Sequence, residues 1–262
     1  MQENYQKNVE VFNETRELSN GEFLPYTKEM QSKTEVYCDP LLLKPEGKGI
    51  YTHYIREKLD TVSAAIKEAN EGYKPCVLNF ADGITPGGCV ALGEKTQEES
   101  ICRCSNLYES LILPECIEKY YEANKKVPMF KCTDSAIYSR DVLFFRENKT
   151  YTILENKFRG DVITCPAPHR HYFDDDVYEE IATNRIRGIV NVAALNDCDS
   201  FIIGAWGCGA FGGDIWVVAK AFAKALKDTS YFKRVVIAIP VRKDDTDTFD
   251  DFVEAFRNSM GF

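Results

Sequence analysis

One stretch of the chain decides the fold: Pro86-Gly87-Gly88-Cys89-Val90-Ala91-Leu92-Gly93-Glu94-Lys95-Thr96-Gln97-Glu98-Glu99. An apolar run at 76–81 leads into this stretch, and a helical pattern at 100–111 leads out of it. A buried strand, a glycine turn and then a helix form the repeating unit of α/β folds. Because glycines let backbone amides approach an anion and acids follow at the helix start, this layout suits binding and protonating a phosphorylated sugar. Residues 86–93 are called the first glycine loop below.

A second glycine loop, at 207–214, follows another apolar run and reads Gly207-Cys208-Gly209-Ala210-Phe211-Gly212-Gly213-Asp214. In an α/β sheet, ligands bind at the carboxyl ends of the strands, and the next helix N-terminus favours an anion. Two such loops can bind a diphosphate between them. The alternative for the second loop is an ordinary tight turn. Phe211 can stack on a sugar or base, or it can fill the core.

The remaining sequence alternates between helical and strand patterns. Three- and four-residue apolar spacing, or its context, predicts helices at 3–19, 52–70, 97–111, 114–123, 177–195, 215–227 and 248–259. Short apolar runs predict strands near 35–37, 76–81, 142–145, 151–154, 162–165, 201–206 and 234–239, and residues 20–50 are turn-rich. This alternation predicts an α/β fold with a largely parallel sheet. We expect an N-terminal helical extension at 1–34 and one domain at 35–262.

The bulk composition is that of a globular protein. The 262 residues are 44% apolar and 28% charged, which argues against disorder. A net charge of −9 and a pI of about 5.0 disfavour a broad nucleic-acid surface, since such surfaces need clustered Lys and Arg. No apolar segment approaches the ~20 residues that cross a bilayer. We therefore expect neither membrane binding nor general nucleic-acid binding.

The ten cysteines are interpreted as reduced thiols of a cytoplasmic protein, because the N-terminus is polar and shows no signal peptide. Cys102 and Cys104 are too close in sequence for the usual metal spacing. His169 and His171 form the only histidine pair, and we interpret them as surface loop residues rather than metal ligands. No metal and no cofactor is expected.

The adjacent acids Glu98 and Glu99 have two interpretations. Thr96-x-x-Glu99 is a capping box, and acids in a first turn favour the helix dipole. The chemical interpretation is glycosidic cleavage, in which a carboxylic acid protonates the leaving oxygen and water captures the sugar. One acid acting in turn as acid and base is the simpler scheme. Adjacent helix residues point about 100° apart, so one glutamate can face a pocket while the other anchors the loop.

An ordered set of motifs extends this interpretation: Val77-Leu78-Asn79-Phe80-Ala81, Gly87-Gly88, Gln97-Glu98-Glu99, Cys102-Arg103-x-Ser105-x-Leu107-Tyr108, Thr164-Cys165-Pro166-Ala167-Pro168 and Gly204-Ala205-Trp206-Gly207-Cys208-Gly209-Ala210-Phe211-Gly212. Across roughly 35–245, the set resembles the bacterial-type poly(ADP-ribose) glycohydrolases, a branch of the macrodomain superfamily. The resemblance implies a macrodomain-like mixed sheet between helices, with ADP-ribose bound in a cleft at the strand ends. It also implies release of ADP-ribose from poly(ADP-ribose) chain ends or from ADP-ribosylated macromolecules.

Two other functions remain open. A macrodomain reader would bind ADP-ribose without turnover, but it would not need the pair Glu98-Glu99. An NAD-binding enzyme would use the Gly-x-Gly-x-x-Gly pattern of the second glycine loop, but that pattern lies late in the chain rather than in a first βαβ unit.

The resemblance also implies roles for individual residues. Glu99 would be the catalytic acid, and Glu98 would bind the ribose next to the scissile bond. The expected substrate-binding residues are Asn79, Gly87, Gly88, Cys89, Gln97, Gly207, Cys208, Gly209, Ala210, Phe211 and Gly212. The family loop usually has three glycines, and here the third is Cys89. Its side chain can crowd the ligand or shift the loop, and its thiol can be oxidised if its pKa is lowered.

Overall fold

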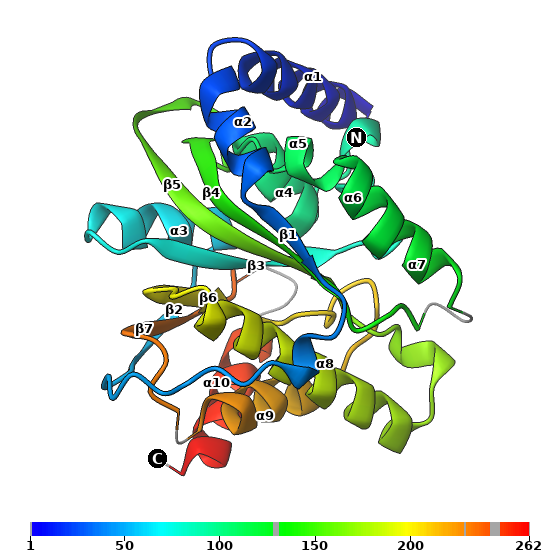
Figure 1. Cartoon of the computed structure of the whole chain (residues 1–262), viewed down its shortest axis with the longest axis vertical. Coiled ribbons are helices and arrows are strands. Elements are labelled where there is room, and N and C mark those ends of the chain that lie inside the picture. Colours follow the sequence, from blue (N-terminus) through cyan, green and yellow to red (C-terminus); the bar gives the residue numbers. More distant parts are fainter. Residues whose placement is uncertain (1, 128–130, 228, 242–246, 262) are drawn as a thin grey trace.

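The computed structural model describes residues 2–127, 131–227, 229–241 and 247–261. Within these ranges, seven strands form one sheet in the order β1-β4-β5-β3-β6-β7-β2 (Figure 1). The strands are β1 (Thr34–Tyr37), β2 (His53–Glu57), β3 (Pro75–Ala81), β4 (Ala136–Arg146), β5 (Ile153–Pro166), β6 (Ser200–Ile203) and β7 (Arg234–Ala238). The pairs from β5 through β3, β6 and β7 to β2 run parallel, whereas β1–β4 and β4–β5 are antiparallel. The predicted mixed, largely parallel sheet is confirmed.

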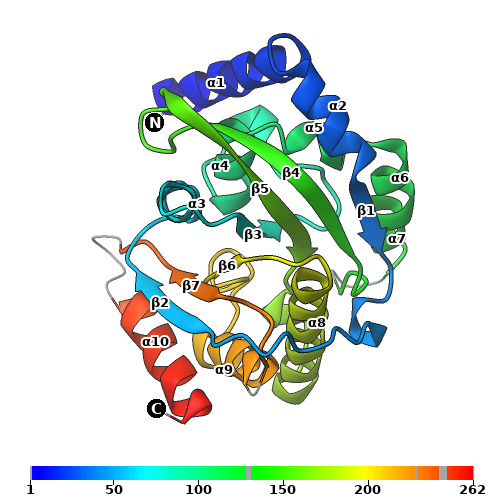
Figure 2. The same ribbon diagram turned by 60° about the vertical axis from the view of Figure 1, so that its left-hand side comes forward.

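Helices cover both faces of the sheet (Figures 1 and 2). One face carries α1 (Gln2–Asn20), α2 (Leu24–Ser32), α3 (Thr61–Asn70), α4 (Gln97–Cys104), α5 (Tyr108–Leu111), α6 (Pro114–Cys116) and α7 (Glu122–Lys125). The other face carries α8 (Asp175–Leu195), α9 (Ile215–Leu226) and α10 (Asp247–Met260). Successive strand residues point to opposite faces, so Val77 of β3 joins one apolar cluster while Cys76 and Leu78 join the other. The sheet is therefore buried on both sides, as parallel strands require.

Several local expectations are wrong. The expected helix at 52–70 is a strand in its first part, because residues 53–57 pair with β7 at the sheet edge. Helix α3 begins only at Thr61, where the Asp60 carboxylate accepts a hydrogen bond from the Ser63 amide at 3.0 Å. Residues 24–32, expected as turns, form α2.

Two further boundaries also differ from expectation. The helix expected at 97–111 is interrupted at Ser105, which forms a β-bridge with Phe144. The strands expected at 151–154 and 162–165 belong to one long strand, β5, which pairs with β4 as a hairpin. These differences reflect strand pairing between distant residues, which local spacing does not report.

The first two helices pack on the body of the fold. Val11 and Phe12 of α1 and Met30 of α2 share an apolar cluster with Ile101 of α4. The division into an extension at 1–34 and a domain at 35–262 stays a prediction. Among the described residues, no helix combines the length and apolarity needed to cross a bilayer.

Candidate active site

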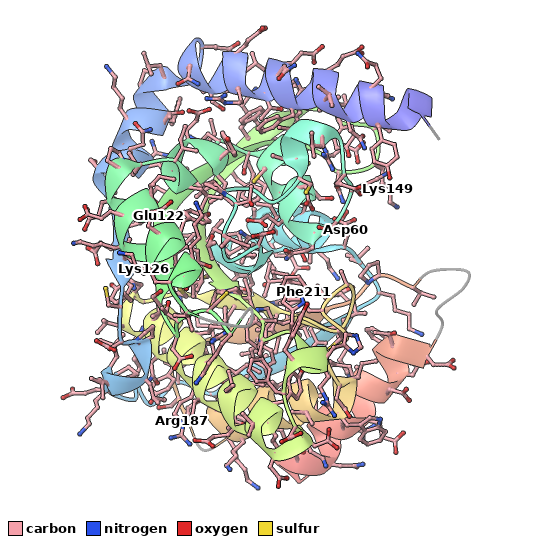
Figure 3. All side chains as sticks on the ribbon, turned by 90° about the vertical axis from the view of Figure 1, so that its right-hand side faces the viewer. Asp60, Glu122, Lys126, Lys149, Arg187 and Phe211 are labelled. Carbon is pink, nitrogen blue, oxygen red and sulfur yellow. The ribbon has the colours of Figure 1, made fainter. Side chains whose placement is uncertain are left out.

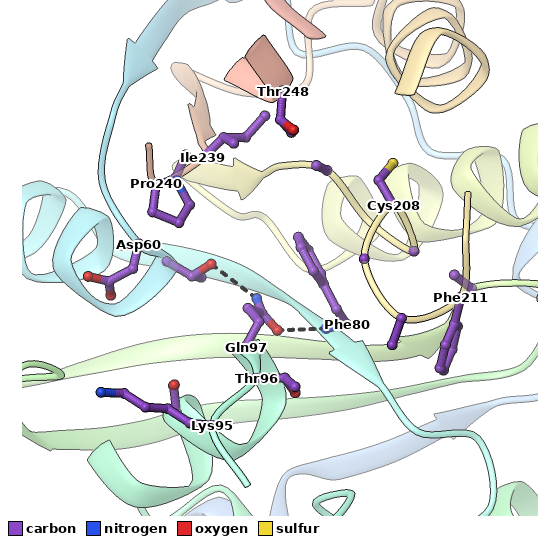
Figure 4. Close-up of a pocket in the computed structure, with 18 of the residues that line it drawn as sticks. Asp60, Phe80, Lys95, Thr96, Gln97, Cys208, Phe211, Ile239, Pro240 and Thr248 are labelled. Carbon is purple, nitrogen blue, oxygen red and sulfur yellow. Dashed lines mark hydrogen bonds between the residues drawn. The ribbon is translucent and has the colours of Figure 1, made fainter. Parts of the chain in front are cut away.

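The two glycine loops open at the same edge of the sheet. Strands β3 and β6 are parallel neighbours, so the chain leaves both at their carboxyl ends. A cavity of about 420 Å³ lies at this edge, within the usual range for small-molecule sites. Figure 4 shows Phe80, at the end of β3, between Gln97 on one side and Phe211 on the other.

Glu98 is anchored to the end of β3. Its Oε1 accepts a hydrogen bond from Asn79 Nδ2 at 3.2 Å, and its Oε2 accepts one from the Asp82 amide at 2.7 Å. The side chain of Asn79 also donates to Thr164 Oγ1 at 3.2 Å, while its Oδ1 is buried with no partner among the described residues. Such a group is costly to leave unpaired, so Asn79 Oδ1 is suited to accept a hydrogen bond from a ligand hydroxyl.

Glu99 caps its helix and contacts the first glycine loop. Its Oε2 accepts hydrogen bonds from the amide of Thr96, at 3.1 Å, and from the Thr96 hydroxyl, which confirms the capping box. Its Oε1 accepts a hydrogen bond from the Cys89 amide at 3.1 Å. The carboxylate therefore ties the start of α4 to the loop.

Both carboxylates converge on Gly88. A Cβ at this residue would lie 2.6 Å from Glu99 Oε1 and 3.1 Å from Glu98 Oε2. Gly88 also has a φ of +58°, which side-chain-bearing residues rarely adopt. Glu99 holds the loop, and both glutamates reach the same glycine; that one of them faces a pocket while the other anchors the loop stays a prediction. The result is a site with two buried acids beside a partly buried glycine.

The pKa of Glu98 is raised well above its usual range, mainly by burial and further by the nearby Glu99 charge, against the two hydrogen bonds that lower it. The folded chain therefore keeps a proton that the unfolded chain releases above about pH 4.3, so stability falls as pH rises from that value. Glu98→Gln has no carboxyl group at this position and therefore lacks this loss of stability with rising pH. In thermal melts, the melting temperature of Glu98→Gln relative to the wild type should therefore increase as the pH rises above about 4.3. A constant difference would contradict a raised pKa.

The second glycine loop is held by the segment that follows β5. The amide of Arg170 donates to the Phe211 carbonyl at 3.0 Å, and the rings of Phe211 and His169 stack with centroids 3.8 Å apart. Asp214 caps α9 by accepting hydrogen bonds from the amides of Trp216 and Val217. Phe211 both lines the cavity and packs against the core, so its two interpretations are compatible.

Gln97 acts as a structural bridge in this structure. Its Nε2 donates to the Leu78 carbonyl at 2.7 Å and to Thr61 Oγ1 at 3.1 Å, and its Oε1 accepts from the Phe80 amide at 2.8 Å (Figure 4). These bonds fix the start of α4 against β3 and α3. Its expected contact with substrate stays a prediction.

The predicted site residues fall into two groups. Gln97 and the loop residues Gly207, Cys208, Gly209, Ala210 and Phe211 line the cavity. Asn79, Gly87, Gly88, Cys89, Glu98, Glu99 and Gly212 are not part of its lining, but Thr96, Gln97 and Ser100 of the same helix start are. The acids therefore border the cavity rather than line it. Gly212 instead faces His171.

Sequence reasoning missed several cavity residues, which include Asp60, Phe80, Lys95, Asn148, Ile239 and Pro240. Some carried a signal. Ile239 and Pro240 follow the last parallel strand at the edge where ligands bind. Figure 3 shows Asp60, Lys149 and Phe211 on the same face of the molecule. Asn148 reaches the cavity from the β4–β5 turn, and the sequence around it gives no indication of this.

Cys89 has an exposed side chain and a φ of −98°, so its side chain does not strain the loop. Partial burial and the charges of Glu99, Asp82 and Glu94 raise the pKa of its thiol. The condition for easy oxidation, a lowered pKa, is therefore not met.

Because the thiolate is the reactive form, iodoacetamide should alkylate Cys89 more slowly than glutathione at neutral pH. Glu94→Gln, which removes one nearby charge, should speed the reaction. Peptide mass spectrometry over time measures both rates, and alkylation as fast as that of glutathione would contradict the expectation.

All ten cysteines are free thiols. Burial lowers the pKa of His169, which favours the neutral ring stacked on Phe211. Within the described ranges, no three His, Cys, Asp or Glu side chains gather as metal ligands do.

Comparisons with known proteins agree with this fold. The family model for the microbial-type PARG (poly(ADP-ribose) glycohydrolase) catalytic domain matches residues 5–147. Poly(ADP-ribose) glycohydrolase from Thermomonospora curvata superposes with a TM-score of 0.85 at 26% identity, over 96% of this chain and 100% of that one. The Deinococcus radiodurans enzyme in complex with ADP-ribose gives 0.78 at 26% identity, over 90% and 96%. The Thermomonospora enzyme bound to the inhibitor ADP-HPD gives 0.82 at 24% identity, over 96% and 100%.

No curated protein matches the chain. The family model nevertheless covers more than half of it, including α1, the first glycine loop and both glutamates. The chain belongs to the microbial-type PARG catalytic domain family.

Proposed function

We propose that the protein releases ADP-ribose from poly(ADP-ribose) chain ends or from ADP-ribosylated targets, and that Glu99 is its acid and base. The convergence of two buried carboxylates on Gly88, beside a cavity lined by the second glycine loop, is the observation that carries this proposal. The Deinococcus relative has been solved with ADP-ribose, which supports the choice of ligand.

In the proposed reaction, the ribose at the scissile bond lies against Gly88. Glu99 gives a proton to the leaving oxygen as the C1–O bond breaks. Water then adds its hydroxide to the oxocarbenium-like C1 and returns a proton to Glu99. Every proton is thus accounted for by one carboxyl group.

Glu98 and Asn79 are proposed to hold the same ribose. Because its pKa is raised, Glu98 holds its proton to higher pH than an ordinary glutamate, and in that form it can donate a hydrogen bond to a sugar hydroxyl. Asn79 Oδ1, which is buried and unpartnered among the described residues, can accept from a hydroxyl. Fixing the sugar in this way supplies the orientation that the proton transfer needs.

The diphosphate is proposed to lie between the two glycine loops, with Gly87 and Gly88 on one side and residues 207–212 on the other. Backbone amides and the N-terminus of α9 are suited to its charge. Phe211 would lie against the terminal ribose. The adenosine half is proposed to lie in the part of the cavity lined by Asp60, Ile239 and Pro240.

The proposal is tested by incubating the protein with poly(ADP-ribose) and with mono-ADP-ribosylated protein and nucleic acid. We expect ADP-ribose as the product from at least one substrate. Tight ADP-ribose binding in calorimetry with no product from any of them would instead favour the reader. NAD binding tighter than ADP-ribose binding would favour the dinucleotide enzyme.

The ten free thiols support our proposal of a cytoplasmic location.

A further inference from the structure

One side of α1 lies directly behind the first glycine loop. Tyr5, Asn8, Phe12 and Thr15 follow each other at three- and four-residue spacing, which puts them on one side of the helix. Helix α1 contacts the turn Val90–Leu92 of the loop as well as α4 and α5. Figure 3 shows this helix across the top of the molecule.

Asn8 fixes the far end of the loop. Its buried Nδ2 donates to the Gly93 carbonyl at 2.8 Å. Gly93 has a φ of +84°, and any Cβ there would overlap the Tyr5 backbone, so helix and loop touch without a side chain between them. The Gly93 amide in turn donates to the Val90 carbonyl at 3.1 Å, which closes the turn that follows Cys89.

A second contact supports the near end of the loop. The Tyr108 ring packs against Gly87, where a Cβ would lie 2.9 Å from its Cδ2. Phe12 meets the same ring edge-on, with centroids 5.0 Å apart, and Arg16 lies over it at 4.9 Å. Helix α1 thus supports the loop directly at Gly93 and through Tyr108 at Gly87.

We propose that α1 is a positioning element for the reaction and that Asn8 is its principal positioning residue. By fixing residues 87–93, Asn8 keeps the Cys89 amide on Glu99 Oε1 and Gly88 against both carboxylates. Asn8 touches neither acid and is placed away from the substrate. This inference rests on the proposed role of Glu99.

The test compares two near-isosteric variants of α1. Asn8→Leu removes the hydrogen bond to the loop. Thr15→Val removes a buried bond of the same length, 2.8 Å, from the same helix to the Arg103 carbonyl at the other end of α4. Both leave one carbonyl unpaired, but only Asn8→Leu releases the loop. The readouts are kcat, KM, melting temperature and hydrogen exchange of a peptide covering 87–94.

Asn8→Leu should lower kcat on the order of 10- to 100-fold, because small misplacements of reacting groups have effects of that size. It should also speed exchange at 87–94. Thr15→Val should lower the melting temperature to a similar extent with kcat nearly unchanged. If Asn8→Leu is too unstable to purify, Phe12→Leu, which removes the edge contact with Tyr108, is measured against the same control and should also lower kcat.

Equal kcat in the Asn8 and Thr15 variants, or unchanged exchange at 87–94, would overturn the inference. Its failure is distinguishable from failure of the proposed function. If Asn8→Leu has normal kcat while Glu99→Gln is inactive, only the positioning role is wrong. If Glu99→Gln is fully active, the proposed role of Glu99 is wrong whatever Asn8 does. If the wild type releases ADP-ribose from none of the substrates, the proposed function is wrong.

Discussion

Glu99→Gln is expected to bind ADP-ribose and to release it from substrate about 10²- to 10⁴-fold more slowly than the wild type, the usual contribution of a general acid or base. The amide is the same size, and its carbonyl oxygen can still accept the hydrogen bonds from Thr96, since Gln also serves in capping boxes; the bond from the Cys89 amide is lost. The amide cannot transfer the proton. Calorimetry with ADP-ribose and a product assay under single-turnover conditions separate the two effects.

The matched control is Glu94→Gln. It removes a negative charge from the residue just after the first glycine loop, near Cys89, but not one of the two carboxylates at Gly88. Its release rate should stay close to that of the wild type. Normal turnover by Glu99→Gln would remove this residue from the mechanism and leave Glu98 as the remaining acid at Gly88.

Gly88→Ala is expected to abolish turnover almost completely. Alanine at the positive φ of this residue adds about 1–2 kcal/mol of backbone strain, and its methyl group would occupy the space next to Glu99 Oε1. Because a shift of roughly 1 Å can slow catalysis about 10²-fold, displacing both carboxylates should lower kcat/KM by at least that factor. Steady-state kinetics and thermal melts measure the two consequences.

The control variant Gly72→Ala separates the effect of backbone strain from the effect of displacing the two carboxylates. Gly72 has a φ of +85° in the turn after α3, and a Cβ there meets nothing within 4 Å. The Gly72→Ala variant should therefore lose about as much stability as Gly88→Ala but keep its activity. Equal activity losses in the two variants would mean that strain alone explains the effect. Retained activity in Gly88→Ala would show that the two carboxylates do not depend on this glycine.

Local sequence patterns predicted the elements that carry the site. The run at 76–81, the first glycine loop and the start of α4 are adjacent in the chain, so their strand–turn–helix order could be inferred from residue types alone. Thr96 and Glu99 are likewise three residues apart, and the capping box formed as expected. What local patterns could not give is the direction of Glu98, which depends on Asn79 and Asp82.

Contacts between distant residues explain most of what was missed. Ile55, Leu59, Val62 and Ile66 have helical spacing, yet Ile55 lies in β2 because β7 offers an edge for pairing. Helix α2 did carry a signal, since Pro25 is favourable in a first turn, although residues 20–50 as a whole are turn-rich. The hydrogen bond from Asn8 to Gly93 joins residues far apart in sequence, and no local pattern reports it.

Glu99 has a structural role in the capping box besides its proposed catalytic role, and this affects which substitutions can be tolerated at this position during evolution. The same carboxylate completes the capping box at the start of α4 and is the proposed acid, so replacing it with alanine would remove helix stability together with the proposed chemistry. A descendant that gave up turnover and kept only binding would still gain from a glutamate at this position. With the proposed roles, drift at Glu99 would be opposed by folding as well as by catalysis. Asn79 Oδ1 has no partner among the described residues, so at that atom only the proposed ligand contact would favour Asn79.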